Sequence, residues 1–151
     1  MSSVNYHIAQ LNLAKAKYSL DDPRMGGFVK QLAAVNSEGE NSSGFVWILK
    51  DETGTAVNFN LFDDPSLLVN LTVWQDIESM KQFVYNGLHQ KVFKERRQWF
   101  DAMDKAHLAM WWVSQGHIPT LLEAKDKMET LWAYGPSKEV FTFRKIFSPS
   151  T

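Results

Sequence analysis

The segment Leu67–Trp74, LLVNLTVW, restricts the fold of this chain more strongly than any other stretch of its sequence. Its side chains alternate in character from one residue to the next, as they do on the two faces of a β-strand. One face is wholly aliphatic, whereas the other carries Asn70, Thr72 and Trp74 beside Leu68. We therefore predict a central strand whose aliphatic face lies under helices and whose mixed face looks into an interior space.

Other segments also have the composition of strands. Tyr6–Leu13 alternates in the same way, and Phe45–Lys50 and His107–Val113 are shorter runs rich in aromatic and aliphatic residues. Such residues are enriched in strands because they fit a pleated, half-buried surface. The polar, turn-rich stretch after the second of these runs predicts an exposed excursion, with a short strand at Ala56–Asn60.

The first helix is marked by its capping residues. Asp22 followed by Pro23 predicts a helix start, because the carboxylate accepts from free N–H groups and proline costs nothing in the first turn. The segment GENSSG, beginning at Gly39, ends this helix. Inside it, Gly26 and Gly27 permit either tight packing or the approach of a ligand, and tight packing is the favoured interpretation.

Two more helical regions follow. One is predicted from Asp76 or Ser79 to Phe100, with Gly87 as a break between two segments. Another is predicted over residues 119–134, because a Gly-Pro pair directly after it stops a helix.

The predicted elements follow the order strand, helix, strand, strand, helix, strand, which is that of the ferredoxin-like α+β fold. We predict a single domain over residues 1–151, extended by the C-terminal helix and by the tail EVFTFRKIF, which adds an edge strand or crosses to a partner. The first two helices would cover only one face of the sheet. Because soluble monomers avoid large apolar surfaces, the other face predicts a homodimer or closure around a ligand.

Composition argues against several classes of function. A formal net charge of −1 disfavours a nucleic-acid interface, and the absence of cysteine excludes disulfides, thiolate catalysis and cysteine-bound metals. No apolar run approaches the ~20 residues that span a bilayer, and the first residues lack a signal-peptide pattern, so we expect a cytoplasmic protein. Six tryptophans and ten phenylalanines indicate a ring-lined pocket, a subunit interface or both.

Several segments carry a family resemblance that spans nearly the whole chain. They are HIAQLNLAKAKYSLDDPRMGGFV, GFVWIL, LVNLTVWQDIESMKQFVY, HQKVFKERRQWF, MWWVSQGHIPTLLEAKDKMETLWAYGPS and FTFR. Together they resemble a bacterial family of unknown function within the dimeric α/β-barrel superfamily. More distant relatives are the antibiotic-biosynthesis monooxygenases, chlorite dismutases and aldoxime dehydratases. The resemblance implies that two ferredoxin-like protomers pack their sheets face to face as a barrel, but it implies no particular reaction.

A candidate catalytic pair lies in the segment YNGLHQKVFKERRQWF. Residues at helical spacing along it share one face, and they are Tyr85, His89, Arg96 and Trp99. In antibiotic-biosynthesis monooxygenases a histidine near the second helix often lies close to the pocket, and His89 is similar in placement. An imidazole can remove a proton near neutral pH, and a guanidinium can clamp a carboxylate or enolate. The alternatives are a structural, hydrogen-bonded histidine and an arginine in a surface ion pair.

The candidate substrate-binding residues are polar and aromatic side chains that would line the barrel lumen. They are Gln10, Asn12, Asn70, Thr72 and Trp74 on the strands, with Tyr85, Trp99 and Trp111 as flat borders. A few polar groups among rings are typical of small-molecule sites. Because Trp111 and Trp112 are neighbours on a strand, only one of them can point inward. Packing in the core or at a dimer interface is the alternative for each tryptophan.

These residues favour a small-molecule enzyme resembling cofactor-free monooxygenases or isomerases, acting on an aromatic or enolisable metabolite. Two alternatives use the same lumen: a non-catalytic binding or sensing protein, and a haem enzyme with His89, His107 or His117 as the axial ligand. A third is an interaction module whose aromatic residues only build the dimer. The histidines lack the spacing of a metal site, and serine-nucleophile and phosphate-loop motifs are missing.

Overall fold

The computed structural model of the protein describes residues 5–19, 22–49, 62, 64, 66–85, 98–103 and 105–149, apart from the side chains of residues 32, 33, 35, 36, 84 and 85. Within this part, an antiparallel sheet contains β1 (Tyr6–Ala16), β2 (Phe45–Ile48), β3 (Leu67–Trp74), β4 (Phe100–Asp101) and β5 (Leu108–Ser114). β1 lies at the centre, with β3 on one edge and with β5 and β4 on the other, while β2 pairs with the outer edge of β3.

Capping residues mark the start of the first helical turn and both ends of the last helix. A short 3₁₀ turn, η1 (Pro23–Met25), leads into α1 (Gly26–Glu40), and the Asp22 carboxylate accepts from the Arg24 N–H before it. The second described helix is α2 (Ile77–Tyr85). The last, α4 (Leu121–Tyr134), is capped by the Thr120 hydroxyl and stops at Gly135, whose φ is 78°.

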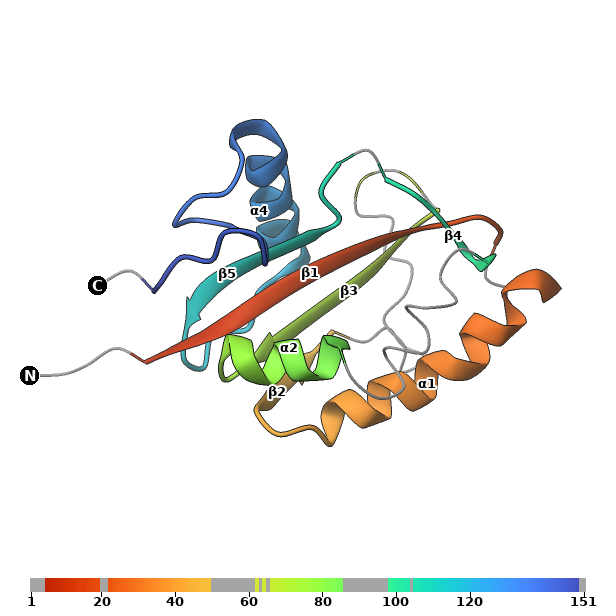
Figure 1. Ribbon diagram of the computed structural model, residues 1–151, viewed down its shortest axis with the longest axis horizontal. Coiled ribbons are helices and arrows are strands. Elements are labelled where there is room, and N and C mark those ends of the chain that lie inside the picture. The colour runs from red at the N-terminus through yellow and green to blue at the C-terminus, as the bar shows by residue number, and fades with distance from the viewer. Residues whose placement is uncertain are drawn as a thin grey trace, which may run out of the picture.

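The chain connections confirm the predicted ferredoxin-like α+β fold. β1 leads through α1 to β2, with β3 lying between the two strands, and β3 leads through α2 to β5, with β1 between them. These are the two interleaved β-α-β units of that fold. α1 and α2 lie on the near side of the sheet in Figure 1, and α4 lies on its far side.

The sheet faces are assigned the opposite way from the sequence prediction. The mixed face of β3 lies towards α1 and α2: Trp74 clusters with Met80 of α2, and Leu68 clusters with Phe28 of α1. The aliphatic face lies towards α4. The prediction was wrong because the apolar residues at both ends of the mixed face are enough to hold two helices.

The expectation that one sheet face stays open in the single chain is also wrong. Leu11, Leu71 and Val73 of the aliphatic face are 0% exposed, and they form one cluster with Ala124 and Met128 of α4. The C-terminal helix therefore covers the side of the sheet opposite α1 and α2, which we expected a second copy or a ligand to cover. The homodimer stays a prediction.

The C-terminal tail packs on its own chain, where a single isolated bridge to β5 replaces a complete edge strand. Phe141 and Met110 exchange both backbone hydrogen bonds, at 2.8 and 2.9 Å. Further along, the indole N–H of Trp112 donates to the carbonyl of Phe147 over 2.8 Å. The tail thus covers β5 on the same side of the sheet as α2 (Figure 1).

Several boundaries differ from those predicted. The predicted helical region reached Phe100. In the structure Phe100 belongs to β4 and pairs with Ala16 of β1, because β1 is longer than expected and offers a free edge there. The predicted strand Ala56–Asn60 lies outside the described residues. The prediction of tight packing is confirmed at Gly27, because a Cβ there would lie 3.3 Å from the Trp99 indole. Of the helices that the structure describes, none is both long and apolar enough to cross a bilayer.

Candidate functional site

Four polar side chains lie together on the two central strands, and we call them the polar row: Gln10, Asn12, Asn70 and Thr72. The register places Gln10 directly opposite Thr72 and Asn12 directly opposite Asn70. Directly opposite residues of an antiparallel pair point to the same face. The row therefore crosses the centre of the sheet on the side of α1 and α2.

Direct hydrogen bonds connect three members of the row with Trp74. The Gln10 amide nitrogen donates to Asn70 Oδ1 and to Thr72 Oγ1, over 2.8 Å in each case. The indole N–H of Trp74 donates to the same Thr72 oxygen over 3.0 Å. Gln10 is 5% exposed and Thr72 is 3% exposed, so little water reaches these bonds. Buried polar networks of this kind hold their members in one orientation.

Asn12 extends the row towards β5. Its Oδ1 lies 3.5 Å from Nδ1 of His107, at the start of that strand. This distance is too long for a strong hydrogen bond. The contact nevertheless places a titratable ring at the end of the row.

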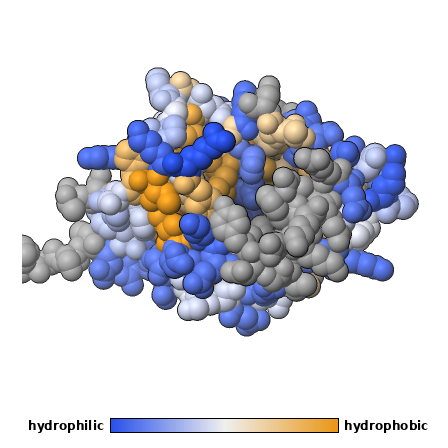
Figure 2. All heavy atoms as spheres, viewed as in Figure 1, coloured by the Kyte–Doolittle hydropathy of each residue, from blue (hydrophilic) through white to orange (hydrophobic). Residues whose placement is uncertain are grey.

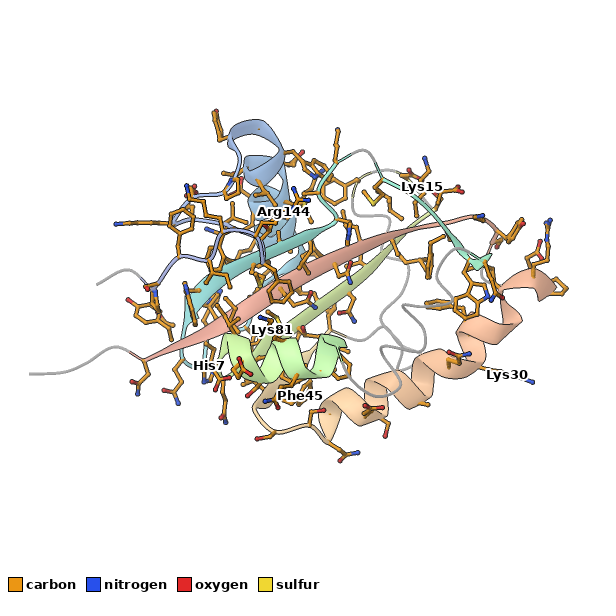
Figure 3. All side chains as sticks on the ribbon, in the orientation of Figure 1. His7, Lys15, Lys30, Phe45, Lys81 and Arg144 are labelled. Carbon is orange, nitrogen blue, oxygen red and sulfur yellow. The ribbon has the colours of Figure 1, made fainter. Side chains whose placement is uncertain are left out.

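One end of the row meets an aromatic cluster under α2. Trp74 stacks on Phe83 of α2 with ring centroids 5.2 Å apart, and Phe45 of β2 meets its edge at 5.5 Å. Ile8 and Met110 complete the floor of this cluster. Phe45 lies close to α2 in Figure 3.

The other end of the row meets a second aromatic cluster, under α1. Phe28 of α1 lies 5.7 Å from the Trp99 ring and 4.9 Å from the Phe100 ring. Leu68 and Met25 pack beside them. The polar row is thus a hydrophilic band between two ring clusters. Figure 2 shows hydrophilic and hydrophobic atoms side by side on this face of the molecule.

The carboxylates with lowered pKa values lie outside the row. The pKa of Asp22 is lowered to about 2 by the side-chain hydrogen bond from Arg24, and that of Asp64 is lowered by the Ser66 hydroxyl. Both carboxylates belong to exposed turns. Lys30 of α1 points away from the sheet (Figure 3). In the part of the chain that the structure describes, no three His, Asp or Glu side chains are grouped as metal ligands would be.

The structure brings together most of the predicted binding residues, but it does not bring Trp111 to them. Trp111 faces α4, where its indole N–H donates to Glu123 over 2.9 Å, and it is Trp112 that faces the side of the row. Trp99 lies in the cluster under α1. Tyr85 ends α2, but its side chain is not described. The predicted catalytic residues His89 and Arg96 lie outside the described residues.

Sequence reasoning missed the phenylalanines that border the row. Phe28, Phe45 and Phe83 belong to three different elements, and only the fold brings them to the same sheet face. Their positions on helix faces could have indicated burial, but not a shared neighbour. Sequence reasoning also missed Glu123, whose carboxylate accepts from Trp111 and lies 2.7 Å from Nε2 of His117 on the α4 side.

A shallow hollow of about 510 Å³ lies away from the polar row. It is lined by residues of α4 and of the segment between β4 and β5, among them Lys105, Glu129 and Trp132. The Lys105 ammonium lies 4.7 Å from the centre of the Trp132 ring, and that indole donates to the carbonyl of Ala106. These contacts stabilise the fold around the hollow and need no ligand to explain them.

Residues 7–151 match a protein family described as Domain of unknown function (DUF3291). The chain belongs to this family. The sequence resemblance to a family of unknown function is thereby confirmed. A search of curated proteins found no match for the DUF3291 chain.

Solved structures with the same fold come from several microorganisms. A conserved protein from Methanosarcina mazei Go1 has 13% identity and a TM-score of 0.50, over 70% of this chain and 90% of its own. A protein from Shewanella oneidensis has 12% identity and a TM-score of 0.51, over 75% and 95%. A Nitrosomonas europaea protein provisionally described as an antibiotic biosynthesis monooxygenase has 12% identity and a TM-score of 0.46, over 78% and 95%. The first two similarities show the fold alone, and they leave the activity of the DUF3291 chain open.

Proposed function

We propose that this DUF3291 protein is an enzyme that holds a small, flat, enolisable metabolite against the polar row and removes a proton from it. The observation that carries the proposal is the row itself. Proteins seldom bury side-chain amide and hydroxyl groups between aromatic clusters, because each buried group needs a hydrogen-bond partner. A few polar groups converging among rings are the usual form of a small-molecule site.

His89 is the proposed base, and Arg96 is the proposed partner of the enolate. α2 ends at Tyr85, two residues after Phe83, which borders the row at one end, and the described chain resumes near Trp99, which borders it at the other. His89 and Arg96 belong to the stretch between these two described positions. This connectivity supports a role for both at the row.

The chemistry requires only these side chains for its first step. The imidazole takes the proton from a carbon beside a carbonyl group, and the electron pair moves onto the carbonyl oxygen. The arginine stabilises that negative oxygen. Return of the proton at another carbon completes an isomerase reaction, and attack of the carbanion on dioxygen begins a monooxygenase reaction. Neither route requires a bound cofactor, and haem chemistry is the minor alternative.

A matched pair of histidine variants tests the proposal. The probe is 2-indanone, a flat ketone with acidic C–H groups, and NMR follows exchange of those hydrogens for deuterium in D2O. We expect His89→Ala to lower the protein-catalysed exchange rate by a factor of about 100 or more, which is typical for the loss of a general base. His117→Ala, on the opposite side of the sheet, is the control and keeps the wild-type rate. An equal rate in His89→Ala and wild type rejects His89 as the base.

The second candidate function is a non-catalytic small-molecule binder. The same polar row favours it, because hydrogen bonding and ring stacking are enough for binding without chemistry. Binding of 2-indanone to wild type, with no exchange above the rate in buffer and no oxygen uptake in air, would favour this candidate over the enzyme.

A further inference from the structure

The hydrogen bonds of the polar row leave a defined set of groups unused. Gln10 donates both hydrogens of its amide nitrogen, one to Asn70 and one to Thr72. The Thr72 oxygen accepts twice, from Gln10 and from Trp74, so both of its lone pairs are occupied. Among the residues that the structure describes, no hydrogen-bond partner meets the Gln10 carbonyl, the Asn70 amino group or the Thr72 hydroxyl proton.

The unused groups form a donor and an acceptor on neighbouring strands. In the arrangement above, the free acceptor is on Gln10 and the free donor is on Asn70. If both amides turn by 180°, Gln10 accepts from Asn70 and from the Thr72 hydroxyl, and the free donor and acceptor exchange places. Either arrangement leaves one amide carbonyl and one amide N–H group unused. The row therefore presents a donor–acceptor edge whichever way the amides are turned.

The strand positions around this edge are uncharged, although the His107 ring lies 3.5 Å from Asn12 at one end of the row. On the row's face of the sheet, the positions of β1 from Ile8 to Ala14, of β3 from Leu68 to Trp74 and of β5 from Leu108 to Trp112 include no acidic, basic or histidine side chain. A charged group of a ligand would lose its hydration there without gaining a counter-charge from these strands. These strands supply no counter-charge, and a neutral partner can pair with the donor–acceptor edge without one.

The groups beside the edge select for shape. Trp74 is held by its hydrogen bond to Thr72 and by stacking on Phe83, and it is 1% exposed. At the other end, Leu68 and the Trp99 ring limit the space along the strands. Such walls favour a flat ring, which loses little conformational entropy on binding.

We propose that the polar row recognises a neutral ring in which an N–H donor and a carbonyl acceptor are adjacent, as they are in a lactam. The ligand N–H donates to the free amide carbonyl of the row, and the ligand carbonyl accepts from the free amide N–H. This ligand class rests on the proposed function of the same site. It adds that the cyclic amide edge, and not the ring alone, supplies the selectivity.

Two probes of equal shape test the inference by isothermal titration calorimetry on the full-length protein. Oxindole carries the lactam edge, and in 2-indanone a methylene group replaces its N–H. We expect oxindole to bind wild type at least about fivefold more tightly, because 2-indanone leaves a buried acceptor unpaired. Asn70→Leu, at a half-buried position, should weaken oxindole binding at least about fivefold. Gln115→Ala, at an exposed position, is the control and should leave both affinities unchanged.

Equal affinities of wild type for oxindole and 2-indanone would overturn the lactam edge. The proposed enzyme would survive that result, because His89-dependent exchange of 2-indanone is measured separately. Failure of both probes to bind would also overturn the edge. Gln10→Met is a second variant with nearly unchanged volume, and it should reduce the ratio of the two affinities to about one. A ratio that stays at the wild-type value in Gln10→Met would contradict the inference even if Asn70→Leu does not fold.

Discussion

Replacing Thr72 by valine tests whether the polar row is held together as its geometry implies. Valine has the shape of threonine but lacks the hydroxyl, so Thr72→Val leaves the Trp74 indole N–H without an acceptor and removes one of two bonds from Gln10. Trp74 is 1% exposed, and water cannot easily replace the lost partner. The loss therefore falls on a buried donor.

The expected cost follows from these contacts. An unpaired buried donor costs about 1–3 kcal/mol, and losing one of two bonds at Gln10 costs about 0.5–1 kcal/mol. The new buried methyl group returns about 0.8 kcal/mol. We expect Thr72→Val to lower the free energy of unfolding by about 2 kcal/mol. Thr72→Ser keeps the hydroxyl and loses one methyl group, so it should lower the free energy of unfolding by about 1 kcal/mol.

Urea unfolding followed by circular dichroism measures these differences, and Thr72→Val should shift the midpoint by about 1 M. A double-mutant cycle with Trp74→Phe isolates the indole bond. Phenylalanine has no N–H, so in the Trp74→Phe background Thr72→Val should cost no more than about 1 kcal/mol. The reasoning fails if valine is tolerated as well as serine, or if the cost of Thr72→Val is the same in both backgrounds.

Two further predictions concern the turns around the sheet. Gly44 has a φ of 84°, and a Cβ there would collide with the Ser79 side chain, whereas Gly116 has a φ of 93° and open space around it. By thermal unfolding, Gly44→Ala should therefore cost about 3 kcal/mol and Gly116→Ala about 1 kcal/mol; equal costs would refute the collision. The hydrogen bond from Arg24 lowers the pKa of Asp22 from 3.8 to about 2, so the carboxylate stabilises the fold above pH 3.8 and this contribution is lost as the pH falls towards 2. Asp22→Asn should be less stable than wild type at pH 6 and equal to it near pH 2, and a difference in urea midpoint that does not depend on pH would contradict the assignment.

Local sequence patterns were sufficient to predict the four main strands and their order with the helices, but not β4. The alternation in Leu67–Trp74 gave the bounds of β3 directly, because a period of two has no other regular explanation. Asp22 marked a helix start for the same kind of local reason, since a side-chain acceptor satisfies free N–H groups of the first turn. The end of the second helical region could not be predicted, because the partner of Phe100 is Ala16, far away along the chain.

The members of the candidate site were partly predictable and its location was not. Gln10, Asn70 and Thr72 stood out because polar residues on a strand face need partners. Their mutual hydrogen bonds depend on the register of β1 and β3, which a sequence pattern does not specify across some sixty residues. His89 and Arg96 stay predictions, since they lie outside the described residues.

What the amino-acid sequence alone established is the alternation of the two central strands, and with it the two lists of residues that share a sheet face. Which list lies under α1 and α2 was decided by packing between distant segments. The aliphatic list could be buried by a partner chain or by α4, and its pattern is the same in both cases. In the folded chain Leu71 and Val73 meet α4, which leaves the polar row to the side where the rings of α1 and α2 gather. Periodicity is a property of neighbouring residues, whereas the choice of covering element depends on the whole fold.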